Sequence, residues 1–137
     1  MIDRWRAMHK EPAVMLIDDD PDATEMYRRG LEMAGFRVQV VNDPDRLPAA
    51  LAGGIPEIFV LDWELGSITG ADVLDRLKSD PLTADKPVIM VSNFPEEADE
   101  DHRTERAGAL AWLLKARTTP QELAGRLHEA LLGRSAD

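Results

Sequence analysis

IFVLDWELG, residues 58–66, decides the fold of this chain. Its first four residues are apolar and rich in β-branched and aromatic side chains, and the run stops at Asp62. A strand that is apolar on both faces is typical of a parallel sheet covered by helices, because neither face meets water. The segment therefore predicts a buried strand that ends on a carboxylate.

Similar short apolar runs lie on both sides of this segment. They occupy residues 13–20, 37–41, 87–92 and 110–115, and helical patterns follow the five runs at 21–34, 42–54, 70–80, 95–108 and 120–133. Five strands that alternate with five helices predict an α/β fold, in which right-handed crossovers place helices on both faces of a parallel sheet. Pro48 lies within the second helical pattern, and we expect it to disturb the middle of that helix.

The composition limits the functional classes. At 137 residues, the chain is expected to form one domain. It contains no cysteine, which excludes disulfides, thiolate metal sites and cysteine nucleophiles. With 16 Lys and Arg against 26 Asp and Glu, the formal net charge is -10, so nucleic acid is not an expected partner. The apolar runs are short and interrupted by charges, so we expect no signal peptide and no membrane span, and a cytoplasmic location.

Acidic side chains follow two of the predicted strands. Asp18, Asp19 and Asp20 end the first strand, and Asp62 ends the third. In a doubly wound sheet of order 2-1-3-4-5 these two strands are neighbours, and ligands lie beyond their carboxyl ends. Two unit charges about 4 Å apart repel by about 4 kcal/mol at an effective dielectric constant near 20. A hard divalent cation that takes oxygen ligands, Mg2+, would relieve this repulsion.

Ser92 and Lys115 end the fourth and fifth predicted strands, at the same edge as Asp62. A carboxylate beside Mg2+ can act as a nucleophile toward phosphorus, because the metal neutralises both the acidic cluster and the phosphoryl oxygens. A hydroxyl and an ammonium group at this edge can hold the other phosphoryl oxygens. The strand ends therefore predict phosphoryl chemistry.

Four segments together resemble one protein family. LIDDDP (16–21), FVLDWELGSITG (59–70), VIMVSN (88–93) and AGALAWLLKA (107–116) resemble the receiver domain of bacterial response regulators. The resemblance extends from Ala13 to Gly133. It implies a flavodoxin-like, doubly wound five-stranded sheet of order 2-1-3-4-5. It also implies an N-terminal extension at 1–12, a receiver domain at 13–133 and a C-terminal tail at 134–137.

The resemblance assigns a metal site and a phosphoacceptor. Asp62 would accept the phosphoryl group. Asp19 and Asp62 would bind Mg2+ directly, Asp18 would assist through water, and Glu64 would contribute its main-chain carbonyl oxygen. The phosphodonor would be a histidine kinase or a phosphotransfer protein.

The resemblance also assigns a switch. Ser92 would be the hydroxyl that turns toward the phosphoryl group, and Lys115 would pair with that group. Trp112 occupies the position of an aromatic residue that changes rotamer on phosphorylation. In this family the aspartyl phosphate shifts the populations of two conformations. A downstream protein partner would then bind the face made by the fourth helix, the fifth strand and the fifth helix, including Trp112.

A few residues depart from the pattern of the family. Ala116 follows the lysine where a proline is usual, commonly after a cis bond; we expect a trans bond, because a cis bond to another residue costs about 3 kcal/mol. Gly66 and Thr69 replace a proline and an aspartate in the loop after Asp62, which we expect to be looser. Asn93 replaces an alanine and would narrow access to the acyl phosphate.

Simpler interpretations exist for single features. Residues 18–20 before Pro21 could be only a helix cap, and Trp112 could be only a packing residue. The acidic run at 96–106 is expected to be a solvated helix face, and residues 1–11 a frayed end rather than a partner-binding helix. The histidines show no ligand spacing and are expected at the surface: His9, His102 and His128.

The sequence thus predicts a stand-alone receiver domain, not an enzyme, that is phosphorylated on Asp62 and signals through protein contacts. A piece of a longer regulator or hybrid kinase is the alternative organisation. One rival function is a phosphorylation-independent adaptor, suggested by Gly66, Asn93 and Ala116. Another is a Mg2+-dependent phosphatase with Asp62 as nucleophile, which would need a substrate pocket and a general acid, for which Glu64 is the nearby candidate.

Overall fold

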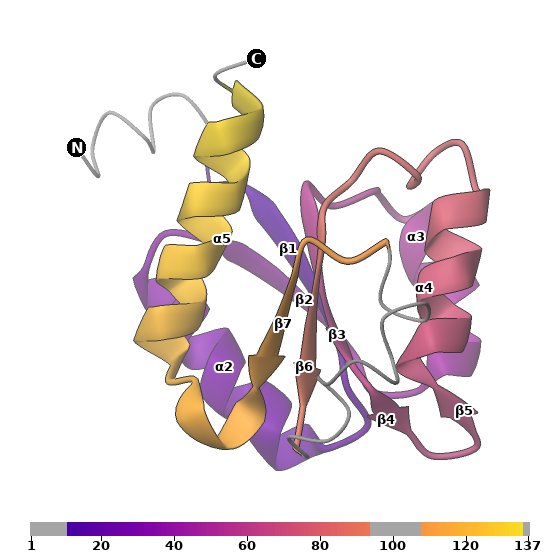
Figure 1. The fold of residues 1–137 in the computed structure, drawn as a ribbon, viewed down its shortest axis with the longest axis horizontal. Coiled ribbons are helices and arrows are strands. Elements are labelled where there is room, and N and C mark those ends of the chain that lie inside the picture. Colours follow the sequence, from indigo (N-terminus) through magenta and orange to yellow (C-terminus); the bar gives the residue numbers. More distant parts are fainter. Residues whose placement is uncertain (1–10, 94–107, 136–137) are drawn as a thin grey trace.

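The computed structural model describes residues 11–93 and 108–135. Five strands form one parallel sheet: β1 (Ala13–Ile17), β2 (Arg37–Val41), β3 (Ile58–Asp62), β6 (Val88–Ser92) and β7 (Ala111–Leu114). The order across the sheet is β2-β1-β3-β6-β7 (Figure 1), which is 2-1-3-4-5 when these strands are counted along the chain. The predicted doubly wound, flavodoxin-like α/β fold is confirmed.

Helices cover both faces of the sheet (Figure 1). One face carries α2 (Pro21–Met33) and α5 (Pro120–Ser135), and the other carries α3 (Leu47–Ala52) and α4 (Gly70–Ser79). Each face buries its own apolar cluster, one including Leu31 and Leu127 and the other including Leu61 and Leu74. All five residues of β3 and of β6 are buried, which explains why these strands are apolar rather than alternating.

Polar caps fix the start of two helices at the carboxyl edge of the sheet. The side chain of Asp20 accepts a hydrogen bond from the main-chain nitrogen of Asp22, and Pro21 fills the first turn of α2. Thr69 and Asp72 form a reciprocal capping box at the start of α4. Both helices therefore begin next to the strand ends that carry the acidic residues.

The second helical pattern differs from the prediction. A 3-10 turn at Pro44–Arg46 precedes α3, and Pro48 lies in the first turn of α3 instead of the middle of the helix. Proline is tolerated at this position because the first N–H groups of a helix have no intrahelical partner. The predicted helix at 95–108 lies outside the described residues except for its last residue, Gly108.

The histidine predictions have different outcomes. His128 was expected at the surface, but it is half-buried on α5 and stacks on Phe36, with ring centroids 4.7 Å apart. The helical pattern around His128 carried no signal for this stacking, because its partner lies in the turn before β2. His9 and His102 lie outside the described residues. Within residues 11–93 and 108–135, no helix combines the length and the apolar character needed to cross a membrane.

Gly70 brings the first turn of α4 against the end of β3. Its N–H donates a hydrogen bond to the carbonyl oxygen of Trp63 at 2.6 Å. A Cβ atom at position 70 would lie 2.5 Å from the carbonyl oxygen of Asp62 and 2.9 Å from the Cα atom of Trp63. Both are main-chain atoms that cannot rotate away, so a larger residue would push α4 off the strand end.

Gly70→Ala should therefore lower the free energy of unfolding by about 1–3 kcal/mol, the usual cost of overpacking. Urea denaturation would measure this change. Gly125→Ala is the matched control, because a Cβ atom at this position of α5 meets no atom of the described residues within 4 Å. Alanine in a helix interior is favoured over glycine by about 0.5–1 kcal/mol. Equal effects of the two substitutions would contradict the steric explanation.

Candidate functional site

The acidic cluster lies at the carboxyl edge of the sheet, between β1 and β3. These strands are parallel neighbours, with Ile17 paired to Leu61. The next residue along each strand direction is an acid, Asp18 and Asp62, so these two acids lie side by side. Carboxylate oxygens of Asp18, Asp19 and Asp62 all lie within 4.8 Å of one another. The structure thus brings together three of the four acids that the sequence placed at this edge.

The fourth acid, Asp20, has a different role, because its side chain caps α2. Its main-chain nitrogen also donates a hydrogen bond to Oδ1 of Asp18 at 3.0 Å. Asp18 is only 5% exposed and Asp62 3% exposed, whereas Asp19 faces solvent. The site therefore combines two buried carboxylates with one that can meet a hydrated ion.

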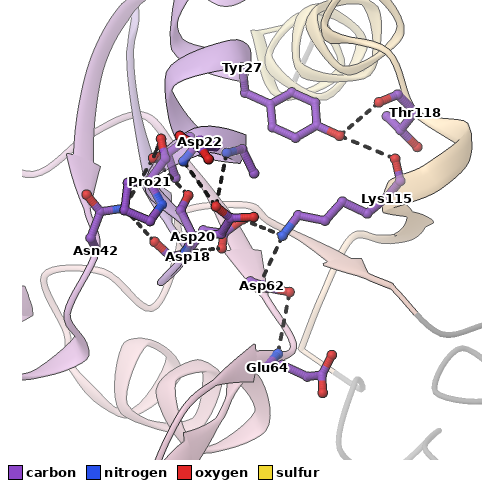
Figure 2. Close-up of polar contacts among 12 residues, drawn as sticks. Asp18, Asp20, Pro21, Asp22, Tyr27, Asn42, Asp62, Glu64, Lys115 and Thr118 are labelled. Atoms are coloured by element: carbon purple, nitrogen blue, oxygen red, sulfur yellow. Dashed lines mark hydrogen bonds and ion pairs between the residues drawn. The ribbon is translucent and has the colours of Figure 1, made fainter.

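Lys115 is the cation that faces the buried carboxylates. Its Nζ lies 2.6 Å from Oδ2 of Asp18 and 3.3 Å from Oδ2 of Asp62 (Figure 2). Burial by itself lowers the pKa of Lys115, but the adjacent Asp18 and Asp62 carboxylates outweigh it and raise this pKa above its ordinary value. The ammonium group therefore stays charged and offsets part of the repulsion between the two acids.

The carboxyl group of Asp62 is strongly affected by its surroundings. Its burial raises the pKa of the carboxyl group, and the negative charge of Asp18 adds to this effect. The positive charge of Lys115 acts in the opposite direction, and the resulting pKa of Asp62 is about 7. A further cation at the site would favour the charged form of Asp62.

The other predicted site residues lie at the same edge of the sheet. Asp62 pairs with Val91 across β3 and β6, so Ser92 lies one residue beyond the neighbour of Asp62, and it is 1% exposed. Leu114 of β7 pairs with Ser92, and Lys115 follows directly. The joint placement that the sequence predicted for Asp62, Ser92 and Lys115 is thus present, while their chemical roles stay predictions.

Glu64 lies at the mouth of the cluster. Its main-chain nitrogen donates a hydrogen bond to Oδ1 of Asp62 at 3.4 Å, and its side chain is exposed. A cavity of about 580 Å³ opens here, lined among others by Asp19, Asp62, Glu64, Asn93 and Lys115. Asn93 is exposed at the wall of this cavity. From this position it would narrow access to a phosphoryl group on Asp62. The use of the Glu64 carbonyl oxygen as a metal ligand stays a prediction.

The loop after Asp62 is more regular than expected. It forms a two-stranded antiparallel hairpin of β4 (Glu64–Leu65) and β5 (Ile68–Thr69). Gly66 has φ +78°, a left-handed conformation that glycine adopts at little cost. The glycine therefore serves a tight turn instead of loosening the segment. The Lys115–Ala116 peptide bond is trans, as predicted.

Two residues near the site were not recognised in the sequence. The Nδ2 of Asn42, after β2, donates to the main-chain oxygen of Asp18 at 2.7 Å and to Oγ1 of Thr24 at 3.1 Å. Tyr27 on α2 donates from its hydroxyl to the main-chain oxygen of Thr118 at 2.8 Å. Tyr27 falls on the apolar stripe of its helix, so its pattern indicated only core packing.

The aromatic pair beside the site was also not anticipated. Trp63 follows Asp62 and is 9% exposed, and Trp112 lies on β7. Their ring centroids are 5.2 Å apart, with the planes tilted by 46°. The residue after Asp62 is thus in contact with a strand two positions away in the sheet.

The doubly wound sheet and its acidic edge define a flavodoxin-like domain with a candidate cation site. Residues 14–128 match the family model of the response regulator receiver domain. The chain therefore belongs to the response regulator receiver domain family.

Two relatives illustrate the similarity in sequence. The phosphate regulon transcriptional regulatory protein PhoB of Pseudomonas aeruginosa is 32% identical over 118 residues, which are 86% of this chain and 51% of PhoB. The DNA-binding dual master transcriptional regulator RpaA of Synechocystis is 35% identical over 89 residues, which are 65% of this chain and 37% of RpaA. The chain thus corresponds to about half of PhoB and to a smaller part of RpaA.

Among solved structures, a CheY-like receiver domain protein from Methanospirillum hungatei has a TM-score of 0.80 at 20% identity, covering 92% of this chain and 98% of the other. A response regulator from Chloroflexus aurantiacus has a TM-score of 0.78 at 26% identity, covering 89% and 98%. TrrA from Thermotoga maritima, solved in complex with Mg2+-BeF, has a TM-score of 0.74 at 16% identity, covering 86% and 97%. These likenesses agree with the strand order of the sheet.

Asp62→Asn should change how stability depends on pH in the metal-free protein. The pKa of Asp62 is raised from 3.8 to about 7 in the folded state, so the folded protein binds more protons than the unfolded chain between these values. The free energy of unfolding should therefore fall as the pH rises through this window, by on the order of 3 kcal/mol. The asparagine variant lacks this decrease.

Urea denaturation in the presence of a chelator, between about pH 5 and pH 8, would measure the difference between the two proteins. Curves that run parallel across this range would contradict the raised pKa of Asp62. Asp75→Asn is the matched control, because it removes an exposed acid of α4 outside the cluster.

Proposed function

We propose that this receiver domain accepts a phosphoryl group on Asp62, with the help of Mg2+, and that phosphorylation changes its contacts with other proteins. The phosphodonor in this proposal is a histidine kinase or a phosphotransfer protein, and the protein acts in the cytoplasm. The observation that carries the proposal is the meeting of Asp18, Asp19 and Asp62 within 4.8 Å, with the ammonium group of Lys115 against two of them. Family membership supports the same reaction class.

The donor set fits Mg2+. Carboxylate oxygens are the hard ligands that this ion prefers, and the exposed Asp19 leaves room for retained waters. When bound, Mg2+ would neutralise the acidic cluster and the phosphoryl oxygens. We assign Asp19 and Asp62 as direct ligands, Asp18 as a ligand through water, and Glu64 as a ligand through its main-chain oxygen.

The residues of the chain then divide the reaction between them. An ionised carboxylate oxygen of Asp62 attacks phosphorus in line, the bond from phosphorus to the donor nitrogen breaks, and the donor imidazole leaves with its electron pair. The ammonium group of Lys115 moves from the Asp62 carboxylate to a phosphoryl oxygen. The hydroxyl of Ser92 holds a second oxygen. The product is an aspartyl phosphate that stays on the protein.

The aspartyl phosphate is the signal in this proposal, so the chain is not an enzyme. Phosphorylation replaces the Asp62 carboxylate that faces Lys115 with a phosphoryl group. This change in the partner of Lys115 changes which conformation is favoured. Trp112 on β7 contacts Trp63, the residue after the phosphoacceptor. A rearrangement at Asp62 can therefore be transmitted to β7 through this aromatic contact. We infer that a downstream partner binds the face made by the predicted fourth helix, β7 and α5, including Trp112; that helix, at 95–108, lies outside the described residues except for Gly108.

Phosphorylation of Asp62 is tested most directly by intact mass. Incubation with Mg2+ and acetyl phosphate should add one phosphoryl group to the protein, and Asp62→Asn should abolish the addition because the nucleophilic oxygen is lost. Asp75→Asn, in the exposed face of α4, should be modified like the wild type. No addition to the wild-type protein would favour the phosphorylation-independent adaptor. Turnover of a simple phosphate ester would favour the phosphatase instead.

Mg2+ binding should change the tryptophan fluorescence, because Trp63 follows a proposed metal ligand. Asp19→Asn should raise the Mg2+ concentration needed for the half-maximal change by about ten-fold or more, equivalent to ~1.4 kcal/mol of binding free energy. Asp75→Asn should leave this concentration unchanged within about two-fold, since a single exposed charge outside the cluster is screened by solvent. If the titration curve of Asp19→Asn coincided with that of the wild type, Asp19 would not be a ligand of the metal.

A further inference from the structure

Tyr27 reaches from α2 to the turn that carries Lys115. Its hydroxyl donates to the main-chain oxygen of Thr118 at 2.8 Å and lies 3.4 Å from the main-chain oxygen of Lys115 (Figure 2). The residue is 3% exposed, and its ring belongs to the apolar cluster that includes Leu31 and Leu123. A buried hydroxyl needs a hydrogen-bond partner, and here it finds one 91 residues further along the chain.

The turn that receives this hydrogen bond follows a weakly buried strand. β7 lies at the edge of the sheet, and its four residues are only half-buried. The 3-10 turn after it, Lys115–Arg117, is held by local bonds, from the nitrogen of Thr118 to the oxygen of Lys115 and from Oγ1 of Thr118 to the oxygen of Leu114. Tyr27 adds a bond to a different element, α2.

The position of this turn matters for the ammonium group. The side chain of Lys115 has four rotatable bonds, so it does not by itself hold the Nζ at one point. The main chain of residue 115 sets the region that the Nζ can reach, and from its place in this turn the Nζ meets the acids at 2.6 Å and 3.3 Å. The next residue is Ala116, which has no ring to restrict its backbone angle φ. A tether from outside the turn therefore supplies a constraint that the turn itself lacks.

We propose that Tyr27 is a positioning residue for Lys115. Its hydroxyl ties the turn at 115–118 to α2, and this tether directs the ammonium group to Asp18 and Asp62. The role deepens the proposed function, in which Lys115 holds a phosphoryl oxygen.

Tyr27→Phe tests the proposal, because it removes the hydroxyl and keeps the buried ring. In the metal-free protein, the rate at which an acetylating reagent modifies Lys115 should rise about five-fold, as expected for loss of one hydrogen bond. Peptide mass spectrometry would measure the rate, with Lys86 as the internal reference. The rate of phosphorylation by acetyl phosphate should fall by a similar factor.

Leu31→Val is the matched control for stability. Leu31 is fully buried on the same helix and has no polar atom to tether the turn, so this variant should weaken packing without exposing Lys115. Faster acetylation in Tyr27→Phe alone supports positioning. Equal acetylation of Lys115 in both variants, or no change in either, overturns it. A wild type that acetyl phosphate does not modify would count against the proposed function, and the acetylation rates would still decide the role of Tyr27.

Discussion

Two buried carboxylates that share one ammonium group constrain the rest of this structure. Asp18 and Asp62 are each at most 5% exposed, and the Nζ of Lys115 lies within 3.3 Å of both. Removing such charges from water is costly unless a partner compensates, and one cation cannot neutralise two anions. Burial raises the pKa of Asp62, and the charge of Asp18, which Lys115 offsets only in part, raises it further. The site is therefore electrostatically incomplete, which is a reason for it to take up a cation.

The fold creates this imbalance by geometry. Parallel neighbours bring their carboxyl ends to one edge, so the residues at or just beyond the ends of β1, β3, β6 and β7 meet although they are distant in sequence. The caps of α2 and α4 and the glycine at position 70 hold the helix starts against the same edge. The apolar strands contribute the low-dielectric surroundings in which each charge interacts strongly. Stability and reactivity at this edge consequently depend on the same packing.

The sequence was most informative where one physical rule dominated. Apolar strands that stop at acids predicted the sheet and the meeting of Asp18, Asp19 and Asp62, because burial and strand order leave few alternatives. It was less informative for Asp20, since an acid before a helix can either bind a cation or cap the helix. Tyr27 and His128 were missed because their partners, Thr118 and Phe36, are set by tertiary packing that no local pattern records.

The departures from the family pattern differ in what they change physically. Gly66 provides the positive φ angle of a regular hairpin, so the segment after Asp62 is ordered without the usual proline. Ala116 follows a trans bond, and the hydroxyl of Tyr27 supplies a hydrogen bond to the turn that would otherwise rest on local contacts. Neither residue removes a group that the proposed phosphoryl transfer needs. Because the acids and Lys115 remain in contact, the departures bear on the rate and on access to the site rather than on whether the chemistry can occur.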